Sequence, residues 1–353
     1  MRPAPLPLAP RPYVGEAVSS WVRRIAARYD IQADSLVSHM LGRRSIGLNR
    51  TERLDHRMDA ELEGALATAA RIAAGRIKAL RIVRDDGSAS CWHRTWPAWC
   101  RDCIRADIAQ HGEIYERAIW RLGCCVLCPD HKIPLDDTCR RCMAEARCHF
   151  EGSKGLLRLA CDACGRVIDP ALCPKSGLDD GAVGAFGVCI TPSLTRLLGE
   201  LQSDLQAALA GSPPKWSWGF VQSANDLTAS VRHLTLCMIL GTRVKCEPRI
   251  DLPEPGPGQV FTPVHEPLTP AALTHYAAYG VLAIAAVMLR SIEAGCRPDH
   301  RWAPDAIRSL DVSSAVIWLP AGQRRVLRSW AAAWECPKGD ALRAAIAEME
   351  SVA

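Results

Sequence analysis

Four short pairs of metal-binding side chains, each with two residues between its partners, follow one another in the middle of this chain. In order they are Cys100/Cys103, Cys128/His131, Cys139/Cys142 and Cys161/Cys164. Two such turns, brought together across a loop, supply the four thiolate or imidazole ligands of a tetrahedral zinc ion. The sequence therefore predicts two Zn²⁺ ions per chain, in two sites that follow one another along the sequence.

Spacing alone leaves the composition of the first site open. Cys125 and Cys128 also form a C-x-x-C pair, so Cys125 competes with His131 for one place beside Cys100 and Cys103. The second site, C-x2-C-x18-C-x2-C, has the spacing of a zinc ribbon. Each set offers four protein ligands and no open position for water, which predicts structural rather than catalytic zinc.

The redox compartment is predicted from the start of the chain and from its apolar runs. Prolines interrupt the first twelve residues where a signal peptide would have its apolar region. The longest apolar run, 276–289, is shorter than the roughly 18 residues that a membrane span needs. We therefore expect a cytoplasmic protein with reduced thiols, in which the cysteines outside the four pairs are small core residues.

The formal charge of +5 is confined to the first ninety residues. Lys and Arg number 15 against 10 Asp and Glu in 1–90, 13 against 13 in 91–180, and 15 against 15 beyond. A basic amino-terminal unit indicates an anionic partner such as DNA, although a solvated basic face is the alternative. The candidate nucleic-acid contacts are Arg43, Arg44, Arg76 and Lys78.

Helical periodicity dominates the chain outside the cysteine segment. Residues 15–29 carry an apolar stripe with arginines elsewhere, 34–41 form a second short helix, and 60–82 one or two more. The first two are compatible with a helix-turn-helix and equally compatible with any helical bundle. Further helices are predicted over 193–209, 224–240, 269–294, 304–309, 321–335 and 340–349.

These patterns predict a mainly α-helical protein with small zinc-ribbon β elements. Residues 1–90 form a basic, helix-turn-helix-like domain, 91–180 a tandem zinc-ribbon domain, and 181–353 a helical carboxy-terminal domain. The segment 211–217 has prolines where a phosphate-binding loop needs glycine, and no nucleophile-elbow motif is present. We expect no enzymatic activity.

Several segments resemble the TniQ family of transposon target-selection proteins, which includes the longer TnsD proteins. P-Y-V-G-E-A-V-S-S-W-V-R-R-I-A (Pro12 to Ala26) is similar to the family's opening, and W-C-R-D-C (99–103), A-I-W-R-L (118–122) and the run 125–142 are similar to its W-R-L, C-x-x-H and C-x-x-C segments. Cys161 to Gly165 completes the resemblance. It favours Cys128 with His131 over Cys125 in the first site.

The resemblance implies an adaptor that does no strand chemistry. Such a protein binds target DNA or a guide-RNA complex and recruits a AAA+ ATPase, which brings the transposase. The resemblance also implies a helix-turn-helix, zinc ribbons and a helical carboxy-terminal region that can form a homodimer. The alternatives are a zinc-ribbon transcriptional regulator that binds DNA, and an enzyme whose zinc is only structural.

Overall fold

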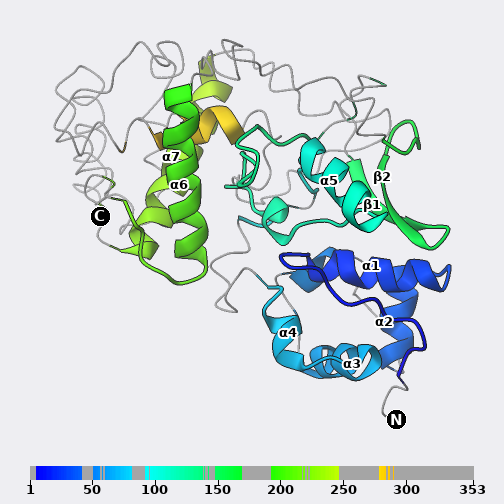
Figure 1. Cartoon of the computed structure of the whole chain (residues 1–353). Coiled ribbons are helices and arrows are strands. Elements are labelled where there is room, and N and C mark those ends of the chain that lie inside the picture. Colours follow the sequence, from blue (N-terminus) through cyan, green and yellow to red (C-terminus); the bar gives the residue numbers. More distant parts are fainter. Residues whose placement is uncertain are drawn as a thin grey trace, which may run out of the picture. The chain divides into compact units, whose positions relative to one another are not determined.

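The chain forms two compact units, Met1–Ser176 and Gly177–Ala353, in the computed structural model (Figure 1). The structure describes residues 5–41, 51–55, 58, 60–81, 92–94, 96–137, 139, 142, 148–168, 192–216, 218, 221, 223–245, 278–283, 285–286 and 289. The boundaries predicted at 90/91 and 180/181 fall outside these residues, so the division into three domains stays a prediction.

Both units are mainly helical, as predicted. The first unit contains α1 (Val18–Arg28), α2 (Ala33–Leu41), the 3₁₀ turn η1 (Thr51–Asp55), α3 (Ala60–Ala70), α4 (Ala74–Lys78), α5 (Arg101–His111), the 3₁₀ turn η3 (Ala118–Arg121), β1 (Cys148–Ser153) and β2 (Leu156–Cys161). The second unit contains α6 (Pro192–Leu209) and α7 (Ala224–Lys245), with further helix within 278–289. The helices predicted over 304–309, 321–335 and 340–349 lie outside the described residues.

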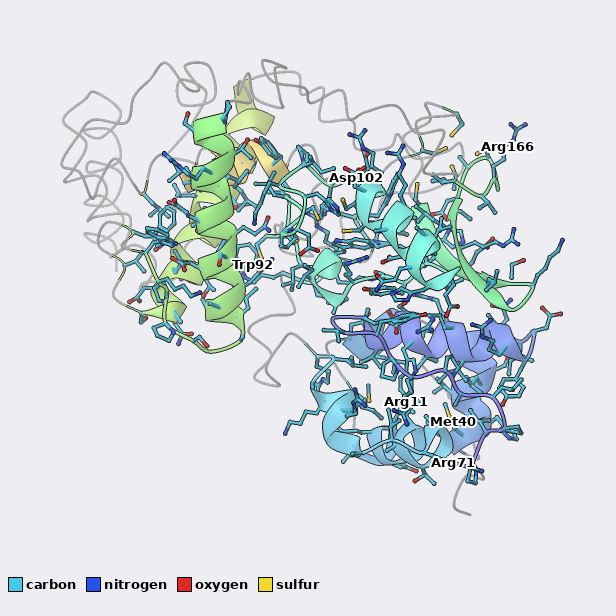
Figure 2. The ribbon with its side chains drawn as sticks, in the orientation of Figure 1. Arg11, Met40, Arg71, Trp92, Asp102 and Arg166 are labelled. Carbon is cyan, nitrogen blue, oxygen red and sulfur yellow. The ribbon has the colours of Figure 1, made fainter. Side chains whose placement is uncertain are left out.

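The predicted helical segment 60–82 is divided in two. Arg71, labelled in Figure 2, follows α3 with a φ of 52°, in the left-handed region that ends a helix. The chain then starts again at α4. Helix α1 begins later than predicted because Gly15 has a φ of 71° and Glu16 forms an isolated antiparallel bridge with Arg117.

A hydrophobic core joins α1 to the helices α2, α3 and α4. Trp21, Val18 and Leu66 are fully buried in it, together with apolar side chains from each of these helices. The Trp21 indole N–H donates to the Pro10 carbonyl at 2.7 Å, so the buried ring leaves no polar atom unpaired. This interaction also fixes the amino-terminal segment against the helices.

The opposite side of α1 packs on the cysteine-containing segment, so that α1 lies between two layers (Figure 1). Strands β1 and β2 form an antiparallel hairpin in the register from Cys148 with Cys161 to Ser153 with Leu156. Gly152 sits where this hairpin meets α1. A Cβ atom there would lie 2.9 Å from Ala27 Cβ, so only glycine permits this close approach.

Buried charges cross the interface between α1 and residues 113–121. Arg24, whose side chain is 2% exposed, donates to Glu16 Oε2 at 2.8 Å and to Glu113 Oε1 at 2.6 Å. Arg28 donates to the other oxygen of Glu113 at 2.9 Å. One arginine therefore neutralises carboxylates from two segments that lie far apart in sequence.

Two serines complete the attachment of α1. Ser20 Oγ donates to Glu16 Oε1 at 2.9 Å and accepts from the Glu116 N–H at 3.0 Å. Ser19 donates its N–H and its hydroxyl to the carboxylate of Asp55, at 2.8 and 2.6 Å. The Ser19 N–H belongs to the first turn of α1, where no intrahelical acceptor exists, so Asp55 caps the helix from η1.

We expect Arg24→Met to loosen α1, because the substitution leaves Glu16 without its buried cation. Hydrogen exchange of the α1 amides should show a local stability lower by about 3–5 kcal/mol. Burial raises the pKa of Glu16 to about 7. Protonation relieves the unpaired charge below that value, so the loss should be smaller near pH 6 than near pH 8.

The double variant Glu16→Gln/Arg24→Met removes both charges and should recover much of the loss. Arg105→Met, at an arginine whose side chain is 43% exposed, serves as the control and should leave α1 unchanged. Equal exchange rates in wild type and Arg24→Met would show that the ion pair contributes nothing to α1.

Candidate metal centres

The first cluster of candidate ligands forms where two distant turns are held together. Trp99 pairs with Asp136 through two backbone hydrogen bonds of 2.7 and 2.8 Å. This pairing places Cys100, at the start of α5, and Cys103, in its first turn, beside the turn 128–131. In that turn Lys132 adopts a φ of 56° and donates its N–H to the Cys128 carbonyl at 2.8 Å, which closes a tight knuckle.

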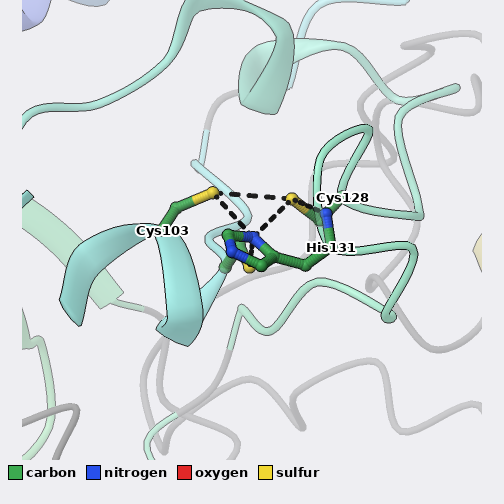
Figure 3. Close-up of side chains that lie close together, drawn as sticks. Cys103, Cys128 and His131 are labelled. Carbon is green, nitrogen blue, oxygen red and sulfur yellow. Dashed lines mark hydrogen bonds between the residues drawn. The ribbon is translucent and has the colours of Figure 1, made fainter. Parts of the chain in front are cut away.

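The ligand atoms of this cluster have the spacing of a tetrahedral metal site. His131 Nδ1 lies 3.5, 3.3 and 3.5 Å from the sulfurs of Cys100, Cys103 and Cys128, and the sulfurs of Cys103 and Cys128 are 3.5 Å apart (Figure 3). Around a zinc ion bound at ~2.3 Å to sulfur and ~2.0 Å to nitrogen, the edges of a tetrahedron are about 3.6–3.8 Å. The four residues therefore fit a zinc ion.

The three sulfurs also favour a thiolate in the metal-free cluster. Hydrogen bonds from the Cys100 and Cys103 thiols lower the pKa of Cys128 well below its usual range, and the backbone N–H of His131 donates to the same sulfur at 3.4 Å. Hydrogen bonding to Cys100 and Cys128 correspondingly raises the pKa of Cys103. A thiolate at Cys128 provides the form that binds metal.

Cys125, the competing candidate, does not join this cluster. It is buried, and its thiol donates to the Leu127 carbonyl at 3.6 Å. His131, by contrast, brings Nδ1 to the centre while its ring remains exposed. The geometry thus groups Cys128 with His131, the pair that the sequence resemblance favours.

The second cluster contains Cys139, Cys142, Cys161 and Cys164, whose sulfurs lie within 4.8 Å of one another. The hairpin supplies the last two. Cys161 ends β2, and Gly165, with a φ of 61°, donates its N–H to the Cys161 carbonyl at 2.9 Å. This knuckle resembles the turn after Cys128. The sulfurs of Cys142 and Cys161 are 3.7 Å apart, close to the edge expected for four thiolates around zinc.

Large aromatic side chains cover the segment that carries both clusters. Trp92, Trp99 and Trp120 are each at most 1% exposed, and the rings of Trp120 and Phe150 stack with centroids 6.3 Å apart. Only Trp96 among the tryptophans of this segment has a substantially exposed ring, at 37%. Three of these four rings are therefore packed in the interior of the first unit. They are not exposed for stacking on nucleic-acid bases.

Two of the four basic residues predicted to contact nucleic acid lie among the described residues. Arg76 and Lys78 are exposed on the short helix α4, on either side of the buried Ile77. Arg43 and Arg44 lie within 42–50, outside the described residues. The role of all four side chains as nucleic-acid contacts stays a prediction.

The buried ion pairs are the functional feature that sequence reasoning missed. Ser20 and Arg24 are four residues apart and lie on one face of α1, and Glu16, four residues before Ser20, immediately precedes the helix cap. A glutamate, a serine and an arginine at that spacing signal a polar stripe within a helix that is otherwise buried. Its partner, Glu113, follows only from the tertiary structure.

The helical layers and the two Cys/His clusters define a helical protein with compact metal-site segments. Residues 7–135 match the family model TniQ, so this stretch of the chain is similar to the TniQ family. The matched region runs from the amino-terminal segment through α1 and includes all four residues of the first cluster, whereas the second cluster follows it. No curated protein matches the chain.

Among the described helices, none is long and apolar enough to cross a membrane.

We expect two zinc ions per chain, because the eight residues of the two clusters close two tetrahedral shells. Native mass spectrometry or elemental analysis of the purified protein should find both. Cys161→Ser should remove one ion and raise hydrogen exchange in the β1–β2 hairpin, since metal binding supplies on the order of 10 kcal/mol to such a site. A folded wild-type protein with one zinc ion or none contradicts this stoichiometry.

We also expect His131 to be required for the first zinc ion and Cys125 to be dispensable. His131→Ala removes a ligand atom that lies 3.3 Å from Cys103 Sγ, whereas Cys125→Ser changes a thiol outside the cluster. Elemental analysis should find about one zinc ion in the first variant and about two in the second. The opposite pattern shows that Cys125 completes the site.

Proposed function

We propose that this protein is a transposition target-selection adaptor that contacts nucleic acid and recruits a AAA+ ATPase. The TniQ match over residues 7–135 carries this proposal and supports a role in target selection during transposition. Contacts with DNA and with the ATPase belong to the proposal. In one form of it, the targeting partner is a guide-RNA complex in place of a DNA sequence.

The bonding of the buried acidic groups supports an adaptor rather than an enzyme. Asp107 accepts two hydrogen bonds of 2.9 Å from Arg117, and Glu116 accepts one of 2.9 Å from Arg121. Metal-dependent strand cleavage needs carboxylates that are available to bind metal and substrate. Asp107 and Glu116 are instead engaged in ion pairs within the first unit.

The proposed zinc ions have a structural role. Each cluster supplies four protein ligands, which leaves no coordination position for a water molecule or a substrate. The two metal sites would fix the surface of the tandem zinc-ribbon segment, which rests on α1. Loss of either ion would therefore act on partner binding through the shape of the first unit.

The basic amino-terminal helices are the proposed nucleic-acid surface. Arg76 and Lys78 are exposed on α4, and α1 and α2 are two packed helices joined by four residues, the arrangement on which a helix-turn-helix is built. Arg43 and Arg44 follow α2 directly in sequence. The charge excess of the first ninety residues supports contacts of these four side chains with phosphates.

We expect charge reversal at Arg43, Arg44, Arg76 and Lys78 to weaken DNA binding without changing zinc content. Each lost phosphate contact should reduce the slope of log affinity against log salt by roughly one unit. Fluorescence anisotropy with duplex DNA over a salt series measures this slope. Reversal of the exposed Lys154 and Arg166 is the matched control and should leave the slope unchanged. An unaltered slope in the fourfold variant places the DNA contacts elsewhere.

The ATPase contact is tested by co-purification with a AAA+ transposition ATPase, in the presence of ATP and DNA. The adaptor proposal expects a complex of the two proteins and stimulation of ATPase assembly on DNA. Metal-dependent cleavage of DNA by the purified wild-type protein overturns the proposal.

A further inference from the structure

A hollow of about 490 Å³ lies within the first unit, between the α1–α2 connection and the β hairpin. Its walls come from α1, residues 31–34, the Trp96–Pro97 segment, and β1 with the knuckle that follows β2, and single residues of η1 and η3 complete them. We call it the hairpin groove. Its volume falls in the range of about 300–1,000 Å³ that is typical of ligand-binding cavities. Neither the metal clusters nor the proposed DNA contacts include its lining residues.

Two large apolar side chains of the hairpin groove are partly exposed. Ile31 is 43% exposed and Trp96 is 37% exposed, and both line the groove. A partly exposed tryptophan and an aliphatic side chain in one groove are typical of the anchoring positions of protein interfaces. The apolar part of the groove therefore suits an aliphatic side chain of a partner.

The charged side chains that line the groove determine which charged group an occupant can carry. Three carboxylates line it: Asp34, Glu151 and Asp162. The two arginines in its wall, Arg23 and Arg121, are directed to the buried Glu116 at 3.4 and 2.9 Å, and they also lie close enough to the buried Asp55 to interact with it electrostatically. Two buried carboxylates thus offset the two arginines, and the carboxylates facing the groove give it an acidic character.

His149 does not reverse this balance. Its Nε2 lies 3.3 Å from Glu151 Oε2, and its Nδ1 contacts Asp162 Oδ1, so it stands between two of the three carboxylates. Even a fully charged imidazolium would leave more negative than positive charge facing the groove. A phosphate group entering it would meet like charge, which disfavours a nucleic-acid backbone as the occupant.

We propose that the hairpin groove binds a segment of a partner protein that carries an arginine or lysine next to an aliphatic side chain. The basic group lies among the carboxylates and over the Trp96 ring, where a cation is attracted by the π face, and the aliphatic group packs on Ile31. This surface is separate from the proposed DNA contacts on α4, so it holds or fails independently of them.

The test uses the full-length, zinc-loaded protein and a fluorescein-labelled peptide with a central Leu-Arg-Leu triplet in a Gly/Ser background. Fluorescence anisotropy should show saturable binding that weakens as salt is added. A matched peptide with Leu-Glu-Leu should bind at least about tenfold more weakly, the equivalent of about 1.4 kcal/mol. Glu151→Arg and Trp96→Ala should each reduce affinity for the arginine peptide by about fivefold or more, as expected for loss of a charge pair or a cation–π contact.

Two matched variants control for changes outside the groove. Glu63→Arg introduces the same charge reversal on α3, and Ile108→Ala, compared with Ile31→Ala, truncates an isoleucine that is 46% exposed on α5. Neither control should alter peptide affinity. Hydrogen exchange of α1 and the zinc content should be the same in all variants, which separates loss of binding from loss of folding.

Three results would overturn the proposal. The first is the absence of saturable binding of the arginine peptide up to about 1 mM, the limit of a weak specific contact. The second is equal affinity for the arginine and glutamate peptides, or unchanged affinity in both Glu151→Arg and Trp96→Ala. The third is weaker binding of a single-stranded oligonucleotide by these two variants with no change in peptide binding, which would assign the groove to nucleic acid.

Discussion

The buried guanidinium of Arg24 holds the two layers of the first unit together. It neutralises Glu16 at the start of α1 and Glu113 in the segment after α5, with its side chain only 2% exposed. A charge removed from water in this way is costly unless its partners are fixed, so Arg24 requires both layers to be in place. The face of α1 that the hydrophobic core does not cover thereby becomes an attachment surface for the Cys/His segment.

That segment depends on other interactions for its own order. Its β hairpin has only two strands, and such a hairpin is not stable alone in water. Two clusters of four ligands, buried tryptophans and the contact of Gly152 with α1 all act on this short stretch. Docking on α1, together with metal ions bound at the two clusters, would replace the larger core that the segment lacks.

The arrangement suits the adaptor role proposed above. Exposed cations of α4 and the acidic hairpin groove lie in the same compact unit, in which buried ion pairs join the layers. The proposed adaptor would contact a nucleic-acid target and a protein partner through separate surfaces. Opposite charge on separate surfaces lets each partner be selected by its own electrostatics.

The sequence by itself determined the main described helices and indicated the candidate metal-ligand pairs and the resemblance to TniQ, because each of these depends on local spacing: two residues within a knuckle, and three or four along a helix. The resemblance also favoured His131 over Cys125, which spacing left open. Tertiary structure alone decided that Glu113 pairs with Arg24, that Gly152 meets Ala27, and that Ile31 and Trp96 face one groove. These contacts join residues tens of positions apart. The local spacing of residues does not indicate which distant side chain will pair with a buried charge or fill a gap.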